Sequence, residues 1–251
     1  MPFQKVQSEK LASAVVRQIE QLILRGILRP GERLPAEREL SERMGVSRPS
    51  LREALSELQE AGLLVARAGA GVYVAEVLGS AFSPALVRLF ATHDDAVYDA
   101  LDFRRDVEGL AADRAARHGS ETDLAVIDAA MNKLEAAPPA EAVALDAEFH
   151  MAIIEASNNV VLLHMMRSMY DLLEGGVFYN RQVVFARCGE RDLLLDQHRA
   201  INAALQARDG AAARAAIEAH LDYIAAAYRD QKRAEANEEI SQRRLRHDIA
   251  R

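Results

Sequence analysis

Apolar residues recur at helical spacing along almost the whole of this 251-residue chain. The first stripe, which is followed by a glycine that can end the helix, is made of Leu11, Val15, Ile19, Leu22 and Ile23. Glycine and proline separate the later stripes, runs of β-branched residues are rare, and alanine clusters such as GAAARAAIEAHL favour helix. The pattern predicts a mainly α-helical protein, and its length is sufficient for two domains.

Residues 1–77 form the first predicted domain. A second helix is expected around Glu37–Met44 and ends at Gly45, and a third helix follows Ser47, a residue type that suits an N-cap. Two short apolar strands then flank a turn at residues 68–71. Two helices joined by a short glycine-containing turn make a helix-turn-helix unit, whose second helix reads the major groove of DNA with its N-terminal residues.

The third helix carries polar residues on its outer face near its start. Its leucines face inward, which leaves outside Arg48, Ser50 and Arg52. Arginine in such a place is usually only solvated, and a net charge of −7 argues against a nucleic-acid partner. The charge is unevenly spread, however: residues 1–77 carry 11 basic and 10 acidic side chains, whereas residues 78–228 carry 13 and 23. A basic face in the first domain is compatible with this distribution.

The rest of the chain is also expected to be helical. Residues 78–97 are interpreted as a linker with a short amphipathic helix, and residues 98–229 as six or so antiparallel helices in an all-α bundle. The first bundle helix should turn inward Leu101, Val107, Leu110 and Ala111. The charged residues 230–251 favour a frayed helical extension over a DNA-binding arm.

Three of the seven histidines lie beside apolar faces of the predicted helices, at positions 150, 198 and 220. Asp146 precedes His150 by one helical turn, so the two share a face and could form an ion pair, a catalytic dyad or part of a metal site. A single inward histidine is more often a hydrogen-bonded core residue than a ligand. Together with His198 and His220, however, the pair supplies a nitrogen-rich set suited to Zn, Ni or another borderline divalent ion. His164 is interpreted as a packed residue.

The stretch ILRGILRPGERLPAERELSERMGVSRPSLREALSELQEAGLLVARAGAGVYV resembles the winged-helix DNA-binding domain of the GntR family almost without gaps. The resemblance implies a winged helix-turn-helix of three helices and a small β-hairpin. It also implies that four positions contact the operator, namely Arg38, Arg48, Arg52 and Gly69, with Ser50 beside them on the recognition helix. Arginine suits this role because its planar fork can grip guanine or a phosphate.

The segments LDAEFH, DQHRAI and AAIEAHL resemble the metal-binding positions of the FCD domain, the helical effector domain of the FadR-like branch of that family. This resemblance implies one divalent ion per chain, Zn or Ni first, held by Asp146, His150, His198 and His220. FRRDVEGLAA resembles the first helix of the same domain, where Arg104 and Glu108 match characteristic positions. Arg104 is therefore expected to pair with the carboxylate of an effector.

The resemblance predicts a homodimer that binds a palindromic operator and controls genes of central carbon metabolism, most similar to regulators that respond to pyruvate or L-lactate. We expect a repressor that a small monocarboxylate releases from DNA. Two alternatives are a regulator for which the ion itself is the signal and a metalloenzyme; the sequence shows no separate general base at a convincing spacing.

Cellular location is constrained by three further observations. No apolar run reaches the roughly 18 residues of a membrane span, and the first ten residues lack the apolar core of a signal peptide. Cys188 is the single cysteine, which excludes an internal disulfide and fits a reducing cytoplasm. We expect this thiol to have no role in the function.

Overall fold

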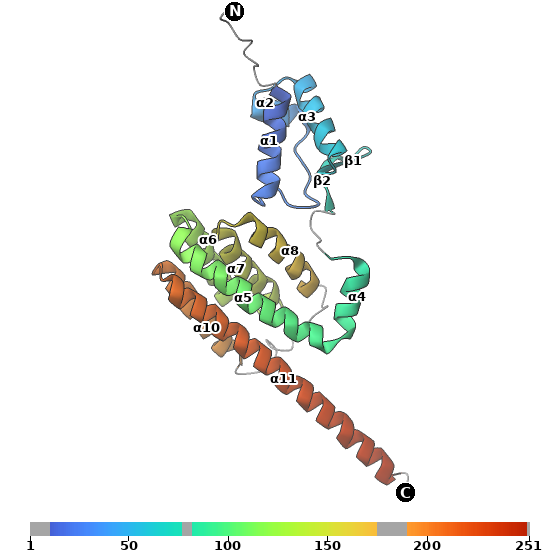
Figure 1. Cartoon of the computed structure of the whole chain (residues 1–251), viewed down its shortest axis with the longest axis vertical. Helices are drawn as coiled ribbons and strands as arrows, with labels where there is room; N and C mark the ends of the chain where they lie inside the picture. Colours follow the sequence, from blue (N-terminus) through green and yellow to red (C-terminus); the bar gives the residue numbers. More distant parts are fainter. Residues whose placement is uncertain (1–10, 77–81, 175–189, 250–251) are drawn as a thin grey trace, which may run out of the picture. The chain divides into compact units, whose positions relative to one another are not determined.

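The computed structural model describes residues 11–76, 82–174 and 190–249, which leaves Cys188 outside the described residues. The chain divides into two compact units, Met1–Phe82 and Ser83–Arg251. Figure 1 shows that helices dominate and that the two short strands belong to the N-terminal unit. The predicted mainly α fold, with a winged helix-turn-helix followed by an all-α bundle, is confirmed.

The N-terminal unit packs its helices and a hairpin around one core. Its elements are α1 (Leu11–Leu24), α2 (Glu37–Met44), α3 (Arg48–Glu60), β1 (Leu64–Arg67) and β2 (Gly71–Val74). The two strands are antiparallel, with Leu64 opposite Val74. Both of these residues are buried with the apolar stripes of α1 and α3, so the hairpin closes the core on which the helices rest.

The turn between α2 and α3 is built by two local signals that the sequence displays. Gly45 adopts a left-handed conformation, with φ of 64°, and its backbone ends α2. Ser47 then caps α3, because its side chain accepts a hydrogen bond from the backbone N–H of Ser50. These contacts confirm the predicted end of α2 and the predicted start of α3. The start of α3 lies on the surface of the unit.

One feature of this unit was not predicted. The segment Gly31–Leu34 pairs with β2: the N–H of Gly31 donates to the carbonyl of Val74 at 3.0 Å, and that of Leu34 to Val72 at 2.9 Å. The loop that leads into α2 is thereby held against the hairpin. A three-residue pairing of this kind has no periodic signal in the sequence.

The C-terminal unit is a bundle of antiparallel helices (Figure 1). They are α4 (Pro84–Thr92), α5 (Asp94–His118), α6 (Glu121–Ala136), α7 (Ala142–Ala156), α8 (Val160–Glu174), α10 (Glu190–Gln206) and α11 (Gly210–Ile249). Helix α11 packs along α5 and α10, and α7 packs against α5, α6 and α8. The centre of the bundle is thus enclosed by α5, α7, α10 and α11.

The inward face of α5 differs from the expected one. Leu110 is 41% exposed, so its predicted inward position is wrong, and Val107 is only partly buried. The buried face instead runs through Leu101, Arg104 and Glu108 to Ala111. Two charged residues can occupy this buried face because they form an ion pair with each other inside the bundle.

Helix α11 continues well beyond the bundle core. Tyr228 is the last residue of this helix that the structure describes as buried, and almost all the residues from Arg229 to Asp248 are exposed. Pairs four residues apart support this part of the helix, for example Arg243 with Glu239. The predicted extension is therefore helical. Among the described residues, no helix is long and apolar enough to cross a membrane.

Candidate functional sites

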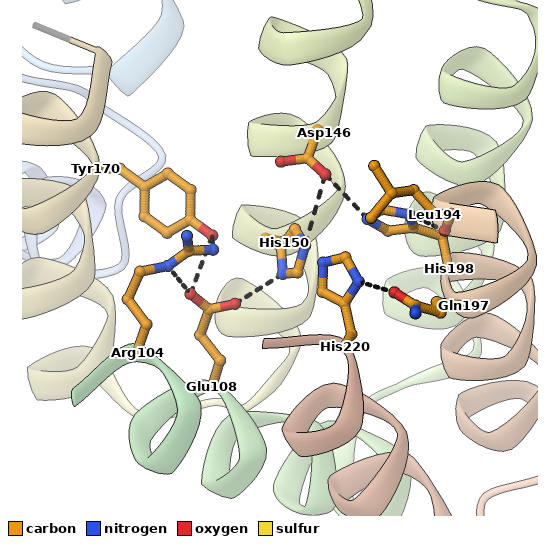
Figure 2. A network of polar contacts seen from close by, with 9 residues as sticks. All are labelled: Arg104, Glu108, Asp146, His150, Tyr170, Leu194, Gln197, His198 and His220. Atoms are coloured by element: carbon orange, nitrogen blue, oxygen red, sulfur yellow. Dashed lines mark hydrogen bonds and ion pairs between the residues drawn. The ribbon is translucent and has the colours of Figure 1, made fainter. Parts of the chain in front are cut away.

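The four predicted metal ligands lie together at the centre of the C-terminal unit (Figure 2). Helix α7 contributes Asp146 and His150, one turn apart, while α10 contributes His198 and α11 contributes His220. Each residue is at most 5% exposed, and one potential ligand atom from each lies within 4.8 Å of the others. The structure thus brings together residues that span 75 positions of sequence on three helices.

The carboxylate of Asp146 lies close to two of the three histidines of this cluster. Its Oδ1 atom lies 2.9 Å from Nε2 of His198 and 3.8 Å from Nε2 of His150. The ring of His220 lies 4.5 Å from that of His198 and 5.3 Å from that of His150, measured between centroids. Atoms bound to one ion at about 2.0–2.2 Å lie roughly 3–4 Å apart, so small side-chain shifts would bring the set to coordination distance.

The outer nitrogen of each imidazole has its own polar contact. Nδ1 of His198 lies 2.7 Å from the carbonyl oxygen of Leu194, and Nδ1 of His220 lies 2.8 Å from Oε1 of Gln197. Nδ1 of His150 lies 2.7 Å from Oε2 of Glu108. At His198 and His220 the acceptor at Nδ1 favours the proton there and leaves the lone pair on Nε2, which is how proteins orient metal-binding histidines.

The buried rings favour their neutral form. Burial lowers the pKa of His220 well below its usual value, and the neighbouring His198 and His150 lower it further. Burial also lowers the pKa of His150, although the carboxylate of Glu108 opposes this effect. Neutral imidazole is the form that binds a metal ion, so the environment prepares these side chains for ligation.

Unsatisfied polar atoms give an independent test of whether the cluster fits a metal ion. Among the described residues, Nε2 of His150 and Nε2 of His198 are buried and have no hydrogen-bond partner of good geometry, and the same is true of Nδ1 of His150 and Oε2 of Glu108, which lie 2.7 Å apart. Such atoms are costly to bury, and native proteins seldom leave them unsatisfied. A divalent cation bound by the two Nε2 atoms and by Asp146 would remove the cost at those atoms, and the donor set of three nitrogens and one oxygen suits Zn or Ni.

Arg104, the predicted effector anchor, lies beside this cluster but is already engaged (Figure 2). It is 1% exposed, its Nε donates to Oε1 of Glu108 at 2.6 Å, and its Nη2 donates to the hydroxyl of Tyr170 at 3.0 Å. Burial alone would raise the pKa of Glu108, but Arg104 and then His150 outweigh it and hold that pKa below its usual range. Glu108 is therefore a carboxylate that lies between Arg104 and His150, a candidate metal ligand.

Sequence reasoning missed the roles of Glu108, Tyr170 and Gln197. A signal existed for Glu108, because it stands one turn after Arg104 on the same face of α5, the spacing that also relates Asp146 to His150. No comparable signal existed for Tyr170 or Gln197, since each reaches the network from a different helix.

The predicted DNA-contacting residues lie on the surface of the N-terminal unit. Arg48 and Arg52 are exposed on the first two turns of α3, and Arg38 is exposed on α2. Ser50 is partly buried and takes part in the cap of α3, since its hydroxyl lies 2.9 Å from that of Ser47. Gly69 is exposed in the turn between the strands, with φ of 70°, a conformation that glycine adopts without strain.

Arg52 has a partner on the preceding helix. Its Nε donates to Oε2 of Glu37 at 2.7 Å, although both side chains remain largely exposed. The contact occupies one edge of the guanidinium. Arg52 is thus held near the start of α3, where helix-turn-helix proteins place the side chains that contact bases in the major groove.

Comparison with known proteins gives the family context. Residues 11–74 match the family described as "Bacterial regulatory proteins, gntR family", and residues 99–223 match the one described as "FCD domain". The chain is 34% identical over 219 residues to the "Putative L-lactate dehydrogenase operon regulatory protein" of Escherichia coli K12, which covers 86% of this chain and 85% of that protein. It is 35% identical over 220 residues to the "Glc operon transcriptional activator" of the same organism, covering 84% and 87%.

A third relative and a solved structure agree with these matches. The "HTH-type transcriptional regulator LutR" of Bacillus subtilis is 32% identical over 206 residues, covering 81% of this chain and 94% of that protein. The solved structure described as "Streptococcus agalactiae GntR" is 23% identical and has a TM-score of 0.54, covering 86% of this chain and 99% of the other. That structure shows the shared fold.

Proposed function

The chain belongs to the gntR family of bacterial regulatory proteins and carries an FCD domain, so it is a transcriptional regulator and not an enzyme, and on this premise we propose a specific role for it. It represses genes of central carbon metabolism and leaves its operator when a small monocarboxylate, pyruvate or L-lactate first, enters the C-terminal unit. It acts in the cytoplasm, as a homodimer on palindromic DNA.

The observation that carries this proposal is the buried cluster of one aspartate and three histidines next to Arg104. The cluster would hold one divalent ion per chain, Zn or Ni first, through Asp146, His150, His198 and His220. Such an ion supplies positive charge and open coordination positions for a carboxylate and an adjacent oxo or hydroxy oxygen. Arg104 stands beside it as a buried cation that can pair with an acid.

The relatives support the choice of a small acid. One is named for an L-lactate dehydrogenase operon, and each of those compared is named as a regulator of transcription. The relative named for the Glc operon is described as an activator, so the sign of control has to be measured for this chain. A reporter gene behind the operator, compared with and without the protein, decides between repression and activation.

Recognition of DNA is assigned to α3 and its neighbours. Arg48 and Arg52 on the recognition helix, Arg38 on α2 and Gly69 in the hairpin turn face solvent and are available to bases and phosphates. A single winged helix makes few base contacts, and pairing two half-sites in a dimer multiplies both affinity and specificity.

The test is a titration of operator binding by the metal-loaded protein with pyruvate, L-lactate and glycolate, and separately with metal ions alone. The proposal expects a small acid to weaken operator binding at constant metal content. If metal alone controls DNA binding and no acid does, the protein is a metal-responsive regulator, a role that the four clustered ligands would equally serve.

A further inference from the structure

We infer that Glu108 sets the charge of the acid that the buried site accepts, and that it does so by neutralising Arg104. This inference rests on the proposed function, since it concerns the same acid at the same site. It identifies a specificity-determining residue that neither binds DNA nor belongs to the four clustered metal ligands.

The two carboxylate oxygens of Glu108 face different partners. Oε1 accepts hydrogen bonds from Nε of Arg104 at 2.6 Å and from the hydroxyl of Tyr170 at 3.1 Å. Oε2 lies 2.7 Å from Nδ1 of His150. The side chain is 2% exposed, so its negative charge is poorly screened by solvent. The contact with His150 places this charge next to the four candidate metal ligands.

The formal charge of the site follows from these residues. Among the described residues of this network, Glu108 and Asp146 carry one negative charge each, Arg104 carries one positive charge, and histidines that bind a metal are neutral. A divalent cation therefore leaves the loaded cluster with a single net positive charge. Buried charge is costly unless it is compensated, so an acid with one negative charge makes the occupied site neutral. A dicarboxylate would leave it with an excess negative charge.

Removal of the Glu108 charge should change this preference. Glu108→Gln keeps the size of the side chain and an oxygen for His150, but it raises the net charge of the loaded site to two positive charges. The opposite change is available at Gln197, whose Oε1 lies 2.8 Å from Nδ1 of His220. Gln197→Glu preserves that contact and lowers the net charge to zero. The two variants bracket the wild type by one charge on each side.

The experiment uses oxamate and oxalate, two-carbon acids of similar size and shape that differ by one charge. Calorimetry on the metal-loaded full chain gives a dissociation constant for each acid, and elemental analysis after the titration verifies that the metal is retained. The measured quantity is the ratio of the two constants in each variant divided by the same ratio in the wild type, because this comparison cancels the intrinsic difference in chelating strength between the acids.

In Glu108→Gln the ratio should shift toward oxalate by at least about tenfold, because one unit of charge acts across a few ångströms in a weakly screened interior. In Gln197→Glu it should shift toward oxamate, by a smaller factor because Gln197 is only partly buried. If Glu108→Gln does not fold or retain metal, the Gln197→Glu ratio decides, and an unchanged ratio there overturns the inference.

Unchanged ratios in metal-loaded, folded variants would overturn the inference and leave the proposed function standing, because the wild type would still bind a small acid. If neither acid, nor pyruvate or L-lactate, binds the metal-loaded wild-type protein, the proposed function itself fails and this inference fails with it. The two failures are therefore distinguished by the wild-type titration alone.

Discussion

The ion pair of Arg104 and Glu108 is the residue-scale feature on which the stability of the bundle should depend most. Both side chains are 1–2% exposed and their nearest atoms are 2.6 Å apart. Breaking a buried pair leaves the other charge uncompensated, so Arg104→Met should lower the free energy of unfolding by about 3–5 kcal/mol. Chemical denaturation of the metal-free protein measures this change.

Two controls separate the lost pair from lost packing. The double variant Arg104→Met/Glu108→Gln should recover most of the stability, because no charge is left unpaired. Arg105, the next residue of α5, pairs with Asp222 at the surface, and Arg105→Met should change stability little. A double variant as unstable as the single one would contradict this account.

Metal retention should depend on individual histidines of the cluster. His198 is 0% exposed and its Nε2 faces Asp146, so His198→Ala should lose the bound ion during purification. His164→Ala is the matched control, since His164 is partly buried on α8 and does not belong to the cluster. Elemental analysis of the purified proteins compares them, and equal metal content in wild type and His198→Ala would remove His198 from the ligand set.

Lowering the pH should destabilise the metal-free protein through His220. The folded state lowers the pKa of this residue well below its ordinary value of 6.5. The unfolded chain therefore binds more protons below about pH 6.5, and stability falls as pH drops through that region. Glu108, whose pKa is also lowered by folding, loses its contribution only below its ordinary value of 4.5. Thermal unfolding between pH 8 and 5 should show the decline. His220→Asn should make it shallower, with a remainder from His150, whose pKa is also lowered, whereas the exposed His118→Asn should leave it unchanged.

At the scale of elements, the recognition helix makes the most direct prediction. Arg48 and Arg52 are exposed near the capped start of α3, and a side chain that reads a base contributes about 1–3 kcal/mol. Arg48→Ala or Arg52→Ala should weaken operator binding by this amount in a gel-shift titration. Arg199→Ala, which removes an exposed arginine of the other unit, is the charge-matched control. Operator binding by both α3 variants at wild-type strength would show that another element reads the DNA.

Elements with a regular apolar stripe could be predicted from sequence because periodicity and caps are local properties. Gly45 indicates the end of α2 and Ser47 indicates the start of α3, and the structure has both helix ends as expected. The pairing of Gly31–Leu34 with β2 could not be predicted, since it depends on backbone hydrogen bonds between segments far apart in sequence. Leu110 was misplaced because hydrophobicity ranks it above Arg104, whose burial depends on a partner.

The candidate site was predictable only in part for the same reason. The ligand residues were recognisable from an Asp/His pair and from two further histidines beside apolar faces. The contacts of Gln197 with His220 and of Tyr170 with Glu108 join residues of different helices, so no spacing along the chain reveals them. Such outer contacts orient the ligands, and for that reason they are the part of a site that a structure adds to a sequence.

At the scale of the whole molecule, the chain joins a DNA-binding unit to a unit for which we propose an acid ligand, and thermodynamics constrains how the two sites are coupled. An acid can change operator affinity only if it binds one conformation of the protein more tightly than another. If the acid weakens operator binding by some factor, operator DNA must weaken acid binding by the same factor. Such couplings are typically about 5–150-fold.

We therefore expect the dissociation constant of the acid, measured by calorimetry on the metal-loaded protein, to rise in the presence of saturating operator duplex. The rise should equal the loss of operator affinity measured at saturating acid, and a duplex of scrambled sequence should produce little change. In Arg104→Lys, which keeps the buried positive charge but not the planar fork that pairs with a carboxylate, acid binding should weaken while the operator affinity of the acid-free protein stays the same. Two unequal factors at the same metal content would show that the acid acts on DNA binding by a route other than this shared equilibrium.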